Sequence, residues 1–160
     1  MSSAQKIAKN TGVLLLSRIV CYVLGFIYVI YSARYLGAAN FGILSFAIAF
    51  TGIFEVFVDL GLNSLATREV ARNKSLAIKY INNIIVIKTI LSILNFLIIA
   101  ILVNLLGYPL QTIEVVYLLT LYLILFNFSS MFFSIFQAFE KMEYQSLGQI
   151  ILASLILPEF

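Results

Sequence analysis

The sequence has no histidine, a single cysteine and few charged residues, and each of these shortages excludes something. Without histidine, the chain lacks the most common metal ligand and the side chain that usually carries protons near neutral pH. Its one cysteine, Cys21, lies inside an apolar run, so we expect a buried packing residue and no disulfide within the chain. The sequence also lacks a nucleophile–base pair, a phosphate-binding glycine loop and a cluster of metal ligands. We therefore expect no enzyme, no cofactor and no metal site.

Apolar residues, in contrast, are abundant. They make up 62% of the 160 residues, whereas soluble domains contain about 45–50% apolar residues. Charged residues make up 11%, compared with about 25% in soluble domains. The length fits one domain, and the mean hydropathy of +1.07 indicates that lipid surrounds most of its surface. The net charge is only +3, and the basic residues stand between apolar runs rather than on a solvated face. We therefore expect no nucleic-acid partner.

Four apolar runs predict four complete transmembrane helices, because each run reaches the roughly 20 residues that a helix needs to cross the hydrocarbon core. The runs lack the strict alternation of barrel strands, so we predict an all-α, polytopic membrane helix bundle. A shorter fifth segment is either a truncated fifth helix or an interfacial segment. The predicted helices of this single transmembrane domain, residues 1–160, are 12–33, 42–65, 83–106, 114–137 and, in part, 147–158.

Basic residues are shared unevenly between the two predicted sides of the membrane. One side has most of them, including the basic loop between the second and third predicted helices, whereas the other side has only Arg34. Because cytoplasmic connections are enriched in lysine and arginine, we expect a cytoplasmic N-terminus in a multi-pass protein of the plasma or inner membrane. The basic residues on the predicted cytoplasmic side are Lys6, Lys9, Arg68, Arg72, Lys74, Lys79 and Lys141.

Four charged residues inside the predicted helices fall at one depth. Arg18 lies about six residues into the first helix, which is roughly 9 Å at 1.5 Å per residue. The second helix runs in the opposite direction and carries Asp59 at nearly the same depth, with Glu55 one turn deeper on the same face. Lys88 reaches this layer from the third helix. Charges at such a depth usually have a partner or a function, so we predict that the four line a water-accessible cavity.

Two other interpretations of this layer stay open from the residues alone. Arg18 and Lys88 are long enough to extend to the cytoplasmic interface, which would leave Asp59 as a water-exposed helix end. The four charges can also form an ion-pair cluster that only holds the bundle together. Further polar residues in the runs are expected to hydrogen-bond between helices or to line a polar passage: Asn95, Asn104, Asn127, Ser129, Ser130 and Ser134.

Four segments of the chain resemble one protein family. They are Asn10-Thr-Gly12, Ala33-Arg-Tyr-Leu-Gly-Ala-Ala-Asn-Phe-Gly42, Asp59-Leu-Gly-Leu-Asn-Ser-Leu-Ala-Thr-Arg-Glu-Val-Ala71 and Gln137-Ala-Phe-Glu-Lys-Met-Glu-Tyr-Gln-Ser-Leu-Gly-Gln149. In their order and spacing they resemble the N-terminal part of polysaccharide biosynthesis proteins. These are the lipid-linked oligosaccharide flippases of the multidrug, oligosaccharidyl-lipid and polysaccharide exporter superfamily. The resemblance extends over nearly the whole chain.

The resemblance implies a transporter that carries a polyprenyl-linked sugar between the leaflets of the membrane by alternating access. It implies Arg18 and Lys88 as candidate substrate contacts, and Glu55 and Asp59 as residues that balance charge or couple transport to an ion. Members of the family have twelve or more membrane helices, so we expect a truncated member or one that a second chain completes. Two alternatives stay open: a small multi-pass subunit that acts by binding another membrane protein, and a fragment of a multidrug exporter.

Overall fold

The computed structural model describes residues 3–155, with side chains for residues 15–151, and every element in this range is a helix. The predicted all-α fold is therefore confirmed. Lys6, Lys9 and residues 156–158 of the fifth predicted helix lie outside the side chains that are described. The elements are α1 (Ser3–Asp59), α2 (Leu62–Arg72), the short 3-10 helix η1 (Lys74–Leu76), α3 (Ala77–Leu105), α4 (Leu110–Ala138) and α5 (Met142–Leu155).

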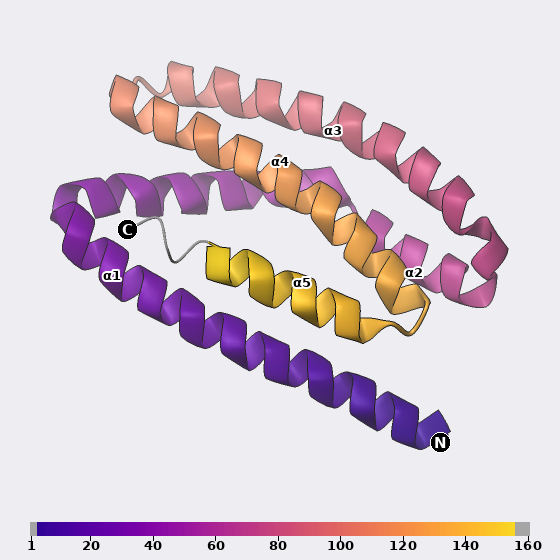
Figure 1. Cartoon of the computed structure of the whole chain (residues 1–160). Coiled ribbons are helices and arrows are strands. Elements are labelled where there is room, and N and C mark those ends of the chain that lie inside the picture. Colours follow the sequence, from indigo (N-terminus) through magenta and orange to yellow (C-terminus); the bar gives the residue numbers. More distant parts are fainter. Residues whose placement is uncertain (1–2, 156–160) are drawn as a thin grey trace.

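Helix α1 consists of two arms that meet at Gly37. The backbone of this residue has φ 70° and ψ 171°, a conformation that is open essentially only to glycine. The helix continues on both sides of the break, and Figure 1 shows the second arm doubling back along the first. The connection between the first two predicted helices is therefore a single glycine, shorter than the gap at residues 34–41 that the prediction left between them.

Three stretches of the described residues are long and apolar enough to cross a membrane. They are residues 15–72, which include both arms of α1 together with α2, and the stretches Lys74–Leu105 and Leu110–Ala138. The two arms of α1 correspond to the first two predicted spans, so the number of four complete spans stays a prediction. The cytoplasmic N-terminus also stays a prediction. Helix α5, with 14 residues, begins five residues before the predicted fifth segment.

A second break separates α1 from α2, where the prediction continued one helix to residue 65. Leu60 has φ 43° and Gly61 has φ 81°, so both residues are in the left-handed region and α1 ends at Asp59. Left-handed backbone costs about 1–2 kcal/mol per residue for an L-amino acid, and glycine avoids this cost. The helix axis therefore changes here, and α2 buries only one face, through Ala66 and Val70.

Helix α4 lies at the centre of the bundle and contacts α1, α2, α3 and α5. Helices α3 and α4 form an antiparallel hairpin, which turns at Gly107 (φ 68°) and Pro109. One apolar cluster joins Ala47 of α1 to Ile99 and Val103 of α3 and Val116 of α4. In Figure 1, α5 lies between the first arm of α1 and α4, while α3 lies on the opposite side of α4. Many large apolar side chains on α1, α3 and α4 are exposed, as expected of surfaces that face lipid.

Candidate functional site

Lys88 is the most conspicuous residue of the interior, because its whole side chain is buried, with 0% of its surface exposed. It lies on the buried stripe of α3, one turn from Ile84 and one turn from Ser92. An ammonium group has three N–H donors and no acceptor, so its burial is costly unless oxygen atoms surround it. The oxygens that surround its Nζ atom therefore define the site.

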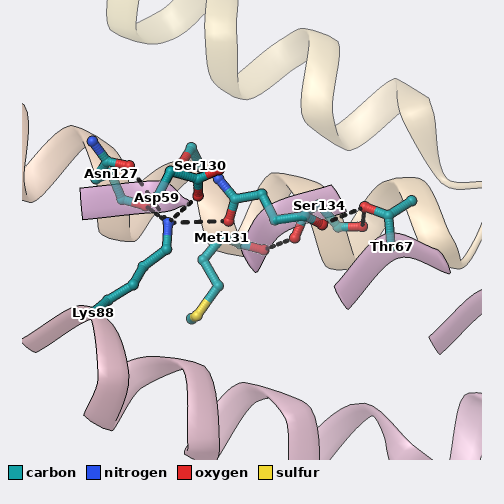
Figure 2. A network of polar contacts seen from close by, with 8 residues as sticks. Asp59, Thr67, Lys88, Asn127, Ser130, Met131 and Ser134 are labelled. Atoms are coloured by element: carbon teal, nitrogen blue, oxygen red, sulfur yellow. Dashed lines mark hydrogen bonds and ion pairs between the residues drawn. The ribbon is translucent and has the colours of Figure 1, made fainter. Parts of the chain in front are cut away.

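Three residues from three other helices provide these oxygens. The Nζ atom of Lys88 lies 3.0 Å from Oδ1 of Asp59 and forms an ion pair with it. It donates hydrogen bonds to Oδ1 of Asn63 and to the main-chain carbonyl of Asn127, each at 3.1 Å, and Oδ1 of Asn127 lies 3.5 Å away. Figure 2 shows the lysine reaching from α3 toward Asp59 and Asn127. The ammonium thus donates hydrogen bonds to Asn63 and Asn127, and the ion pair with Asp59 balances its charge.

The acceptors of Lys88 lie on both sides of the break between α1 and α2. Asp59 is the last residue of α1, whereas Asn63 belongs to the first turn of α2, so the ammonium holds both sides of the break at Leu60 and Gly61. Asn127 adds α4 to the cluster. One buried cation therefore joins four helices at the point where the chain changes direction. Broken helices of this kind surround the binding sites of many membrane transporters.

The polar network continues along the surface between α2 and α4. Asn63 donates through Nδ2 to Oγ of Ser130 at 2.9 Å, and Ser130 donates to the main-chain carbonyl of Asn127 at 2.8 Å. Thr67 donates to the carbonyl of Ser134 at 3.1 Å (Figure 2). The prediction of hydrogen bonds between helices is confirmed for Asn127 and Ser130. It is also confirmed for Asn104, which donates to the Tyr117 hydroxyl at 2.7 Å. The hydroxyls of Ser129 and Ser134 bond within their own helix instead.

The structure brings together two of the four charges that the sequence places at one depth. Asp59 and Lys88 pair directly, so the interpretation in which Lys88 extends to the interface is wrong. Arg18 lies exposed on the first arm of α1 and forms no ion pair with any described residue. Glu55 is half-buried and interacts electrostatically with Tyr122 of α4, and it too forms no ion pair within the described part of the chain. Counting residues along a helix gives depth, but not the direction in which a side chain points.

The predicted basic loop lies at the surface. Arg68 and Arg72 are both well exposed, and their guanidinium groups lie 2.9 Å and 3.9 Å from Oε1 of Glu69. Lys74 and Lys79 are also exposed, and Nζ of Lys74 lies 5.6 Å from the centre of the Phe139 ring. Exposed ion pairs of this kind contribute about 0–1 kcal/mol, so the loop is a solvated basic surface rather than a structural joint.

Asn63 is the residue of the site that sequence reasoning missed. Its amide accepts from Lys88 and donates to Ser130, so it connects the ion pair to the rest of the network. The signal was its position four residues after Asp59, within the segment that resembles the family. In an unbroken helix, however, this spacing would predict only that Asn63 lies on the same face as Asp59. It would not predict that Lys88 contacts residues of two separate helices.

A hollow of about 180 Å³ lies beside this network, between α2, α4 and α5. It shares Asn63 and Ser130 with the network, and all of its lining side chains are uncharged. The residues that line it are Asn63, Ser64, Thr67, Phe126, Ser130, Phe133, Ser134, Gln137, Gln145 and Gln149.

Comparison with known protein families gives one match. Residues 7–157 match the model of the family described as polysaccharide biosynthesis protein. No curated protein and no solved structure matches the chain. Because the match covers nearly all of the 160 residues, it confirms the resemblance that the four sequence segments indicate.

Proposed function

We propose, because the chain belongs to the polysaccharide biosynthesis protein family, that it takes part in moving a lipid-linked sugar across the membrane. The observation that carries the proposal is the fully buried ammonium of Lys88, which is braced across a break between two helices. Insertion scales give a cost of about 2.5–3.5 kcal/mol for a lysine at the centre of a membrane helix, which is an upper bound at the depth of Lys88, and charged residues inside membrane helices often mark transport pathways. The apolar helices and the family match together support a membrane protein of polysaccharide biosynthesis.

The two cations have different roles in this proposal. Arg18 is exposed and unpaired within the described residues, so it is free to bind the anionic phosphate that links the sugar to its lipid. Lys88 is fully occupied by Asp59 and its other acceptors, so it binds the phosphate only when the ion pair opens. Asp59 then competes with the phosphate for the same ammonium, while Glu55 balances charge nearby. The cycle involves no covalent step and no cofactor.

Alternating access moves one half of a transporter against another half. We therefore propose that further membrane helices, such as those of a second chain, complete the passage beside the first arm of α1. That arm carries Arg18 and exposes a large apolar surface, including Tyr22 and Phe26. The surrounding membrane lipid, in the plasma or inner membrane, covers the rest of the apolar surface. The N-terminus and the exposed basic loop face the cytoplasm.

The proposal is tested by following a fluorescent polyprenyl-linked sugar in vesicles that contain the protein. A quencher added outside reports how fast the label crosses from the inner leaflet. We expect Arg18→Gln to slow crossing about tenfold or more, since a hydrogen bond to a charged group contributes about 1.5–3 kcal/mol. Arg34→Gln is the matched control, because Arg34 is also exposed on the first arm of α1. It should change the rate less than about twofold.

Two outcomes of this assay would overturn the proposal. If Arg18→Gln and Arg34→Gln behave alike, the phosphate does not bind at Arg18. If the unmodified, folded protein moves no lipid-linked sugar, even in membranes that contain the other proteins of its native membrane, the chain acts as a binding subunit. Crossing of cationic drugs in place of the sugar would favour the multidrug exporter.

A further inference from the structure

The hollow beside the Lys88 network is lined mostly by uncharged polar side chains. Its lining residues belong to α2, to the C-terminal half of α4 and to α5. Eight of its ten lining residues are Ser, Thr, Asn or Gln, and the other two are Phe. Phosphate sites commonly contain lysine or arginine, neither of which is among these residues, and drug sites are mostly apolar. The lining instead suits a neutral ligand with many hydrogen-bonding groups.

The polar groups of the hollow divide into two sets. On the side of the network they are already in use, since Asn63 bonds to Lys88 and Ser130, and Thr67 bonds to Ser134. On the opposite side, the amides of Gln137, Gln145 and Gln149 form no hydrogen bond with another described residue. The Oε1 atom of Gln145 is buried without a hydrogen-bond partner in the described part of the chain.

Each of these glutamine amides has an oxygen that accepts and a nitrogen that donates two hydrogen bonds. Buried polar atoms of folded proteins are nearly always paired, so the oxygen of Gln145 is open to a donor on a molecule in the hollow. Hydroxyl groups, which both donate and accept, are the natural partners of amides. A ligand with several hydroxyls arranged around a small ring would satisfy all three glutamines.

An aromatic ring forms the wall between α4 and α5. Phe133 is held against α5 because Gly148 lets the two helices approach closely: a Cβ atom at Gly148 would lie 2.7 Å from Cε1 of Phe133. The ring offers a flat apolar surface next to the polar amides. The volume of about 180 Å³ is smaller than the roughly 300 Å³ at which pockets for drug-sized ligands begin, so one small ring fits rather than a large molecule.

We propose that the hollow between α2, α4 and α5 binds one neutral sugar ring, whose hydroxyls bond to Gln137, Gln145 and Gln149 and whose apolar face lies on Phe133. In identifying this ring as part of the transported substrate, the inference rests on the proposed function. The sugar would then contact Asn63, and through it the ion pair of Lys88 with Asp59. Occupation of the hollow would thereby act directly on the group that holds the helix break.

The absence of tryptophan from the sequence provides a clean test. Phe126→Trp places a single fluorescent residue in the lining, at a position that is 38% exposed and therefore tolerant of a larger ring. The matched control is Phe132→Trp, on the same helix and 49% exposed but outside the hollow. The protein is placed in phosphatidylcholine nanodiscs without sugar detergents, and titrated with glucose, galactose, N-acetylglucosamine and inorganic phosphate at constant ionic strength.

We expect a saturable change of Phe126→Trp emission with at least one sugar, none with phosphate, and none from Phe132→Trp. Adding Gln145→Leu and Gln149→Leu should weaken sugar binding about tenfold, since each lost hydrogen bond contributes a few-fold. A response to phosphate, or no response to any of the sugars, would overturn the inference. Sugar binding without transport would refute the proposed function alone, whereas transport without sugar binding would refute only this pocket.

Discussion

Lys88 and Arg18 are both single cations inside apolar helices, yet the fold surrounds them in opposite ways. Lys88 lies on the buried stripe of α3, where Asp59, Asn63 and Asn127 provide its acceptors. Arg18 lies on the first arm of α1, exposed and without an ion pair among the described residues. The difference lies in the surroundings: α3 packs against α1, α2 and α4, whereas the first arm lies on the far side of α5 in Figure 1.

Lys88 is a charge that stabilises the fold, whereas Arg18 is a charge that is available to bind a ligand. A buried ion pair gains little stability over apolar packing, but removing one partner leaves an uncompensated charge. Lys88 therefore holds the helix break in place and cannot leave its partners without a cost. Arg18 has no such constraint, so it can bind a substrate without first giving up a partner. Substitutions test this division, and the largest effect is expected at Lys88.

Replacing Lys88 with methionine should destabilise the protein most. The change leaves the carboxylate of Asp59 without its cation and removes the bridge between α1 and α2. Loss of one partner of a buried pair costs about 3–5 kcal/mol, and we expect the lower end because Asp59 is 29% exposed. The measurement is the free energy of reversible unfolding in mixed lipid–detergent micelles. A loss below about 1 kcal/mol would show that the buried lysine does not stabilise the contact between α1 and α2.

Gly61→Ala should have an intermediate effect, because it tests whether the break that Lys88 bridges is set by the local backbone. Gly61 has φ 81°, which costs a residue with a side chain about 1–2 kcal/mol, so we expect a loss of that size in the same unfolding assay. Gly25→Ala, in the middle of the first arm, is the control. A Cβ atom there meets no neighbour within 4 Å, and alanine favours helix by about 1 kcal/mol over glycine. Equal losses in both variants would contradict the account.

Arg18→Met should have the smallest effect on stability. The side chain is exposed and has no described ion pair, so the free energy of unfolding should change by less than about 0.5 kcal/mol. The same variant, reconstituted in vesicles, should show a strong loss of transport of the lipid-linked sugar. Large destabilisation by Arg18→Met would show that this arginine, like Lys88, stabilises the fold, and would contradict the contrast between the two residues.

The sequence predicts the helices and the depth of their charged residues better than it predicts the direction in which the charged side chains point. Apolar runs identify the ends of α3 and α4 to within one residue, because twenty apolar residues in a row have few other structures available. They place the starts of these helices six and four residues too late, because the first turns of both helices are more polar. Depth counting also correctly places Asp59 beside Lys88. It does not reveal that Arg18 forms no ion pair with a described residue, because the order of helices around the bundle depends on packing between segments that are distant in the sequence.

The break after Asp59 was equally hard to predict. Leu60 shares the left-handed backbone with Gly61, although leucine is a common helix residue and the apolar pattern continues past it. The contact of Lys88 with the main-chain carbonyl of Asn127 leaves no trace in residue identity, since every residue has such a carbonyl. Only the three-dimensional arrangement of α3 and α4 reveals it.

The most direct test of the central claim, that Lys88 and Asp59 act as one unit across the helix break, is a double-mutant cycle. Asp59→Asn, Lys88→Met and the double variant are compared with the original protein by their free energies of unfolding. We predict a coupling energy of about 1.5 kcal/mol or more, with the double variant more stable than Lys88→Met alone. Effects that add to within about 0.5 kcal/mol would show that the two residues are independent, and would contradict the account.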